Sequence, residues 1–134
     1  MKIDFIKSCK GNCDISKRII NDLANNILNK LQYNAENVTI EVLLVEKEKM
    51  REINKKFRKV NQATDVLSFP QKTIKKSPEK NIGSIIISPE VAEETKQKCS
   101  DLFIHGLLHL LGYDHETNKL KWKKAEERII KNEL

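Results

Sequence analysis

The chain lacks the features that mark membrane-embedded, secreted and disulfide-stabilised proteins. Its 134 residues contain no apolar run long enough to span a membrane. The N-terminal segment MKIDFIKSCKGNC has neither the apolar stretch nor the small-residue cleavage site of a secretory signal. Cys9, Cys13 and Cys99 are an odd number, and the C-x3-C pair has no further ligands nearby for a zinc knuckle. We therefore expect a cytoplasmic protein with free thiols.

Aromatic side chains are also scarce, with four Phe, two Tyr and one Trp in the chain. We expect Phe69, Tyr113 and Trp122 to lie in the core, which leaves few rings for stacking on bases. The charge is biased, because 25 Lys and Arg against 19 Asp and Glu give a net charge of +6. Such a balance fits an RNA or ribosome partner that is recognised by shape and backbone, although the lysines are spread along the chain.

Hydrophobic residues make up 39% of the chain, enough for one ordinary core, so we expect a single domain over residues 1–134. Short apolar runs predict strands, and apolar residues at helical spacing predict helices. The expected strands are 2–6, 38–45, 66–69 and 82–88, and the expected helices are 16–31, 46–57, 89–98, 102–111 and 119–131. Because strands and helices interleave, we predict an α+β fold with a mixed sheet packed against helices.

The ends and inner faces of these helices are also predictable. Serine residues are the expected N-caps, and these are Ser16, Ser88 and Ser100. The residues expected to face the core are Ile19, Ile20, Leu23, Ile27, Leu28 and Leu31 in the first helix, and Met50, Ile53 and Phe57 in the second.

The three histidines are the strongest chemical signal, because all lie within residues 103–115 in an H-x3-H-x5-H pattern. On a helix, His105 and His109 stand one turn apart on the same face and can bind one ion. Gly112 is a natural helix end, and a chain reversal there can return His115 to that face. Three imidazoles with an open fourth position suit a hydrolytic zinc site. The alternative is three ordinary histidines on an apolar helix, which this spacing disfavours.

The same spacing matches the H-E-x-x-H-x-x-G-x-x-H pattern of metzincin peptidases at the histidines and the glycine. Gly106 replaces the glutamate that serves those enzymes as general base, and Met1 and Met50 lie upstream, where they cannot form their Met-turn. A metallopeptidase is therefore an alternative that lacks its base. A second alternative is a non-enzymatic ribosome-assembly factor with a structural metal, although structural zinc is usually closed by four protein ligands.

Three segments resemble one bacterial family, and they extend over much of the chain. HGLLHLLGYDH (105–115), NKKFRKVNQATDVLSFP (54–70) and NIGSIIIS (81–88) are similar to signature blocks of the YbeY family, metal-dependent endoribonucleases of ribosomal RNA maturation. The first two blocks are long and specific. There are two departures: Ser84 replaces the aspartate that usually follows the glycine of the third block, and the segment between residues 88 and 105 is shorter than usual.

The resemblance implies a mixed α+β sheet and one zinc-type ion, or another divalent transition metal, on His105, His109 and His115. It also implies that Arg58 lies close to that ion and is needed for activity. The implied work is cleavage of single-stranded RNA in 3′-end maturation of the small-subunit ribosomal RNA, together with ribosome quality control. The implied partners are the small ribosomal subunit, one of its proteins and an Era-type GTPase.

These residue types suit the hydrolysis of a phosphodiester. Zinc held by three histidines lowers the pKa of its bound water to about 7, and Arg58 can bind phosphate oxygens bidentately. The alternative for Arg58 is a solvated charge at the end of a basic helix. Asp114, Glu116 and Asp65 are candidates for moving a proton or orienting a ligand, with Asp65 favoured as a turn residue. Ser68 can contact substrate or only pack, and the RNA 2′-hydroxyl is an alternative nucleophile.

Overall fold

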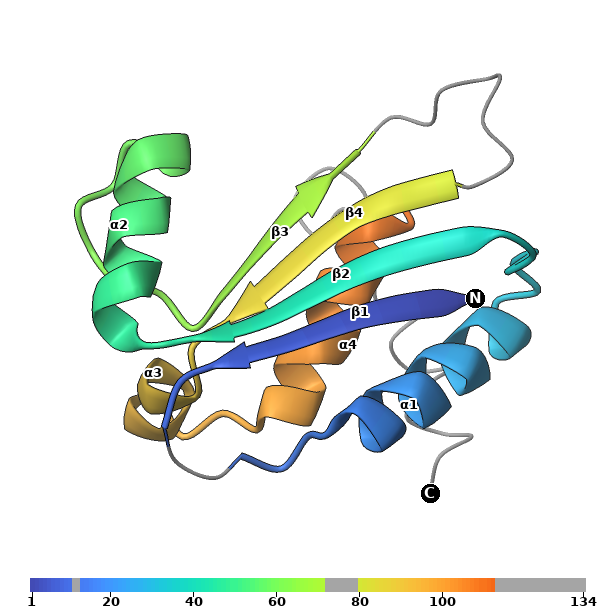
Figure 1. Ribbon diagram of the computed structural model, residues 1–134, viewed down its shortest axis with the longest axis horizontal. Coiled ribbons are helices and arrows are strands. Elements are labelled where there is room, and N and C mark those ends of the chain that lie inside the picture. Colours follow the sequence, from blue (N-terminus) through green and yellow to red (C-terminus); the bar gives the residue numbers. More distant parts are fainter. Residues whose placement is uncertain (11–12, 72–79, 113–134) are drawn as a thin grey trace.

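A twisted sheet forms the frame of the molecule, and its strand order differs from the order along the chain. The computed structural model describes residues 1–10, 13–71 and 80–112. Within these residues the strands stand in the order β1-β2-β4-β3, and they are β1 (Lys2–Ser8), β2 (Val38–Val45), β3 (Val66–Pro70) and β4 (Lys80–Ile87). β1, β2 and β4 run parallel, whereas β3 is an antiparallel edge strand paired with β4 (Figure 1). The predicted mixed sheet is thereby confirmed.

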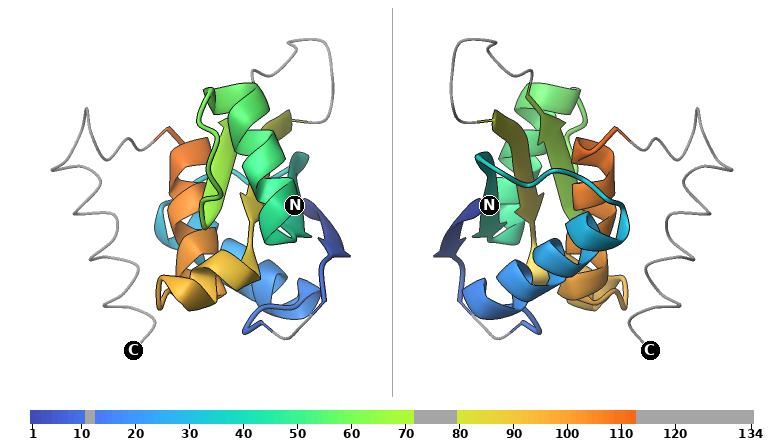
Figure 2. Two further views of the ribbon diagram at one scale, coloured as in Figure 1. Left: turned by 90° about the vertical axis from the view of Figure 1, so that its left-hand side faces the viewer. Right: turned by 90° about the vertical axis from the view of Figure 1, so that its right-hand side faces the viewer.

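Helices cover both faces of this sheet. Those in the described residues are α1 (Lys17–Lys30), α2 (Lys47–Arg58), α3 (Pro89–Glu94) and α4 (Cys99–Leu110). The larger core lies between the sheet and helices α1 and α4, and a smaller core lies between the sheet and α2 (Figures 1 and 2). The α+β prediction is confirmed, while the predicted last helix at 119–131 lies outside the described residues. No helix in the described ranges has the length and apolar character needed to cross a membrane.

The alternation along β2 shows how one strand serves both cores. Its side chains that are buried toward α1 and α4 recur at every second residue, as a strand requires, and are Val38, Ile40, Val42 and Leu44. Val45 is buried on the opposite face with Met50 of α2. The far end of β2 is therefore covered on both sides, as the sequence predicts. β4 lies between β2 and β3, which confirms the prediction of an inner strand.

Two residues that were predicted to face the core are exposed. Ile19 is 42% exposed and Phe57 is 57% exposed, so their assignment to the inner helix faces is wrong. In α1 the buried line passes through Ile20, Ala24 and Ile27, which leaves Ile19 at its margin. Phe57 continues the inner line of α2 into its last turn, where the edge strand β3 covers it only in part.

The caps of α1 and α3 follow the prediction, whereas the end of α3 does not. The hydroxyls of Ser16 and Ser88 each accept a hydrogen bond from a backbone N–H three residues later. α3 ends at Glu94 rather than at the predicted Lys98. The chain turns back at Lys96, whose φ of 58° cannot continue a right-handed helix.

The N-terminus of α4 is capped from a distant part of the chain. The Asp14 carboxylate accepts hydrogen bonds from the backbone N–H groups of Cys99 (2.9 Å) and Ser100 (3.2 Å) and from the Ser100 hydroxyl (2.6 Å). Ser100 lies inside α4 and is not its N-cap, which corrects the prediction. Partial burial alone would raise the pKa of Asp14, but the hydrogen bonds from Ser100 and Cys99 outweigh it and lower that pKa.

We expect Asp14→Ala to lower the free energy of unfolding by about 1 kcal/mol, the usual cost of removing a helix cap. Because the native pKa of Asp14 is lowered, its carboxylate stabilises the fold above its unfolded pKa, and this contribution is lost as the pH falls below about 4. Urea unfolding at several pH values measures the difference in the free energy of unfolding between wild type and variant. This difference should become smaller in acid. A difference that is independent of pH would contradict the role of the carboxylate. Asp22→Ala, at an exposed position of α1, is the control.

The three cysteines are free thiols, as predicted. Cys9 and Cys13 are half-buried at the margin of the larger core, and Cys99 is buried within it. Burial raises the pKa of the Cys99 thiol to about 12, so this thiol stays protonated at neutral pH. Cys99 therefore contributes to packing rather than to chemistry.

Candidate active site

α4 carries two of the predicted metal ligands on a helix that is otherwise largely apolar. Its buried side, which includes Phe103 and Leu107, packs against β3 and β4. His105 is exposed and His109 is half-buried, and the centroids of their rings lie 5.3 Å apart. The structure thus brings together the pair that the four-residue spacing predicts. The third predicted ligand, His115, lies outside the described residues.

The separation of the two rings fits a shared ion. Two imidazoles at one tetrahedral ion, each with a metal–nitrogen distance of about 2.0–2.1 Å, have centroids about 5 Å apart. Within the described ranges, no group of three His, Cys, Asp or Glu side chains could hold a metal. The histidine pair alone would supply two of the ligands that such an ion needs. The other candidates, Asp114 and Glu116, lie outside the described residues together with His115.

Gly106, the residue after the first histidine, faces the sheet. A Cβ atom at this position would lie 2.9 Å from Ile85 Cγ2 of β4, closer than side chains normally approach. The glycine thus allows α4 to lie close against β4. A glutamate here would enter the buried interface between helix and sheet, so the general base of a metzincin has no place at this position.

Two glycines with positive φ shape the end of α4. Gly112 has a φ of 92°, and its N–H donates to the His109 carbonyl at 3.0 Å, so the helix stops here as predicted. Gly83 on β4 has a φ of 137°, and a Cβ there would lie 2.3 Å from the Phe69 carbonyl oxygen and 2.8 Å from Leu110 Cδ2. Gly83 therefore permits the close approach of β3, β4 and the last turn of α4.

Ser84, which departs from the usual pattern of its sequence block, faces away from the histidine pair. Because Ile85 points toward α4, its neighbour Ser84 points to the opposite face of the sheet. There the Ser84 hydroxyl donates a hydrogen bond to Glu41 Oε1 of β2 at 3.4 Å. A carboxylate is thus present beside this position on the neighbouring strand, and the fold accommodates the serine as expected.

Arg58 ends α2 and reaches the edge strand. Its Nη2 donates to the Ser68 carbonyl of β3 at 2.8 Å, and its guanidinium carbon lies 4.9 Å from the centroid of the Phe69 ring. β3 also packs against α4, so one strand connects this arginine to the helix that carries the histidine pair. Ser68 thus positions Arg58 through its backbone. The Asp65 contact in this region is also made by the backbone: its carbonyl accepts a hydrogen bond from the Ser88 N–H at 2.9 Å.

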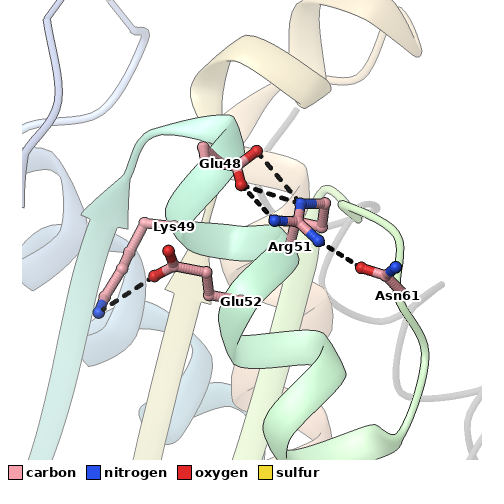
Figure 3. Close-up of polar contacts among 5 residues, drawn as sticks. All are labelled: Glu48, Lys49, Arg51, Glu52 and Asn61. Carbon is pink, nitrogen blue, oxygen red and sulfur yellow. Dashed lines mark hydrogen bonds and ion pairs between the residues drawn. The ribbon is translucent and has the colours of Figure 1, made fainter.

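The turn after α2 is held by residues for which the sequence predicts no role of their own. Asn54 is buried, and its side-chain amide donates to the Gln62 carbonyl at 2.8 Å. Arg51 binds both Glu48 on its own helix and Asn61 in the turn (Figure 3). A polar residue within the inner stripe of an amphipathic helix is a signal that could have identified Asn54, because buried amides need partners. The contacts of Arg51 with the turn have no such signal.

The arrangement defines a class of protein: an α+β domain in which a mixed sheet supports a helix that carries two histidines one turn apart. Residues 5–133 match the family described as Endoribonuclease YbeY. The chain belongs to the YbeY family, as the sequence blocks also indicate.

Individual relatives agree with this assignment. The chain is 41% identical to the Endoribonuclease YbeY of Nautilia profundicola, and the match covers 96% of this chain and 89% of that protein. The identity and both coverages are the same for the Endoribonuclease YbeY of Sulfurimonas denitrificans. The solution structure of TM1509 from Thermotoga maritima has a similar fold, with a TM-score of 0.55 and 27% identity over 97% of this chain and 90% of that one.

Proposed function

We propose that this chain is a zinc-dependent endoribonuclease that cuts single-stranded RNA. The observation that carries the proposal is the match to the Endoribonuclease YbeY family across residues 5–133. The separation of the His105 and His109 rings on α4 supports a metal-dependent mechanism. The proposed biological role is 3′-end maturation of the small-subunit ribosomal RNA, together with ribosome quality control, in the cytoplasm.

His105, His109 and His115 are the residues proposed to hold the ion, with one position left for water or substrate. When bound, zinc supplies hydroxide at neutral pH and a positive charge beside the scissile phosphate. Asp114 and Glu116 flank the third histidine in the sequence, and either can orient it or accept a proton. Other divalent transition metals also bind imidazole, so zinc is the first metal to test rather than a unique choice.

Arg58 is the proposed phosphate-binding residue. A guanidinium stays charged and binds two phosphate oxygens at once, which stabilises the additional negative charge of the transition state. Its planar group has several N–H donors, and the hydrogen bond to the Ser68 carbonyl uses one of them. Arg58 is thus anchored from the end of α2 to β3 and keeps further N–H donors for a ligand. The RNA 2′-hydroxyl is the alternative nucleophile to water in this scheme.

The proposed partners are the small ribosomal subunit, one of its proteins and an Era-type GTPase. A net charge of +6 supports association with a ribosomal RNA surface. Assays of cleavage should therefore include small subunits as well as free RNA, because the ribosome is the proposed setting of the reaction.

Metal removal is the direct test of this proposal. With zinc, we expect the purified chain to cut a single-stranded RNA that carries the small-subunit 3′ precursor, and to spare the same RNA annealed to its complement. Chelation should slow cleavage by more than about 100-fold, because the nucleophile and the positive charge are lost together, and added zinc should restore it. Gel analysis of end-labelled RNA measures both effects.

Two outcomes would count against the proposal. Cleavage that continues at the same rate in chelator would rule out a zinc-dependent mechanism. If neither free RNA nor RNA in small subunits is cut while the chain still binds those subunits, a non-enzymatic assembly factor becomes the better account.

A further inference from the structure

The last turn of α2 and the two residues after it form a surface of which the proposed mechanism uses only Arg58. This surface is called here the 55–60 patch, and its exposed residues are Lys55, Lys56, Phe57, Arg58, Lys59 and Val60. Figure 1 shows this end of α2 at the periphery of the molecule. The patch combines a run of cations with apolar side chains and contains no acidic residue.

The two halves of α2 differ in how their charges are paired. In the first half, Arg51 binds Glu48, and Lys49 lies 3.7 Å from Glu52 (Figure 3). The second half contains cations that form no ion pair with a carboxylate in the described part of the chain, and these are Lys55, Lys56 and Lys59. Cations gathered without carboxylate partners attract a polyanion, so this end of α2 suits a nucleic-acid backbone.

Phe57 places an aromatic ring among these cations. Its side chain is 57% exposed, which is unusual for a residue that continues the buried stripe of an amphipathic helix. The Phe57 and Phe69 rings meet in a T-shaped contact, with centroids 5.4 Å apart and planes inclined at 62°. Lys56 Nζ lies 5.3 Å from the centroid of the Phe57 ring, and Arg58 lies over the Phe69 ring. Phe57 thus contacts Phe69 of β3 and the Lys56 ammonium, and more than half of it remains exposed to solvent.

We infer that Phe57 is a stacking platform for one unpaired base of an RNA strand, and that the lysines beside it bind the adjacent phosphates. An exposed ring offers a flat apolar surface on which any base stacks, independent of sequence. The bases of a duplex are already stacked on both faces, so such a platform selects single strands. The scarcity of aromatic residues does not exclude this role, because one displayed ring suffices for one base. The inference rests on the proposed function for the identity of the ligand.

Binding to strands with and without bases tests the platform. The first probe is a single-stranded 2′-O-methyl oligonucleotide of about 12 nucleotides, a length that spans an ordinary binding site and cannot react through a 2′-hydroxyl. The second is an abasic strand with the same number of phosphates. We expect Phe57→Ala in the full, metal-free chain to weaken binding of the first probe by about tenfold, and of the abasic strand by less than about twofold. Fluorescence anisotropy measures both affinities.

Three further variants separate stacking from other effects. Phe57→Leu keeps apolar bulk against Phe69 but lacks a π face, so it should unfold at the wild-type temperature and bind the first probe as weakly as Phe57→Ala. Phe57→Trp should bind that probe at least as tightly as wild type. Lys55→Ala should weaken binding of both probes equally and reduce the salt dependence by about one counterion.

The inference is overturned if Phe57→Ala weakens both probes equally, or weakens neither. The second of these results is also the one expected if an acidic protein surface, rather than RNA, occupies the 55–60 patch. The cleavage assay tests the proposed nuclease function separately from the role of Phe57. If probe binding depends on Phe57 but RNA is not cut, the platform is supported and the nuclease function is refuted. If RNA is cut but Phe57 does not contribute to probe binding, the nuclease function is supported and the platform is refuted.

Discussion

Replacement of His109 by alanine should abolish RNA cleavage and the binding of zinc. His109 is half-buried, with its ring 5.3 Å from that of His105, and the variant would leave a two-imidazole site. Loss of a group that merely orients a metal ligand costs about 10- to 100-fold in metal affinity or activity, so loss of the ligand itself should exceed about 100-fold. Cleavage rates and the metal content of proteins purified side by side measure the two effects.

Leu111→Ala is the matched control for this experiment. Leu111 is also half-buried, lies at the same end of α4 and carries no metal-binding atom on its side chain. This variant should retain zinc and cut at nearly the wild-type rate, and thermal unfolding of both variants distinguishes a lost ligand from a lost fold. If His109→Ala cuts as fast as wild type, the activity belongs to a contaminant, and if the variant also retains zinc, the proposed ligand set is refuted.

Introduction of the peptidase glutamate at Gly106 should destabilise the protein rather than convert its activity. The helix lies so close to β4 that a Cβ atom at this position would already be 2.9 Å from Ile85 Cγ2. Gly106→Glu would place a carboxylate without a partner in that interface, which costs about 3–5 kcal/mol. Since a domain is stable by only about 5–15 kcal/mol, the expected fall in unfolding temperature is at least about 10 °C.

Two variants define the cause of this loss. In Gly106→Ala, the new methyl group displaces Ile85, but alanine also favours the helix by about 1 kcal/mol, so the net loss should stay below about 2 kcal/mol. Asn25→Glu, at an exposed position of α1, adds the same charge to a helix without burying it and should change stability little. A stable Gly106→Glu protein would show that α4 does not pack as described. Peptide cleavage by that variant would support the alternative that the protein is a metallopeptidase.

Local spacing along the chain determined much of this protein by itself. The four-residue interval between His105 and His109 predicts a pair on one helix face, because one helical turn covers nearly four residues, and the rings are paired. Alternation along 38–45 predicts β2, and Gly112 predicts the end of α4. The sequence blocks also indicate the family, which the match across residues 5–133 shows. These features are predictable because each depends on residues that lie close together in the sequence.

Only the tertiary structure decided which distant segments meet. Strand order places β4 between β2 and β3, and no periodicity in the sequence encodes that choice. Asp14 caps α4 through Ser100, 86 positions further along the chain, and so moves the helix start away from the predicted cap. Phe57 follows the inner stripe of its helix yet is exposed, because an edge strand covers only part of that turn. Helical spacing specifies which side of a helix is apolar. How much of that side is buried depends on how far the sheet extends beneath the helix.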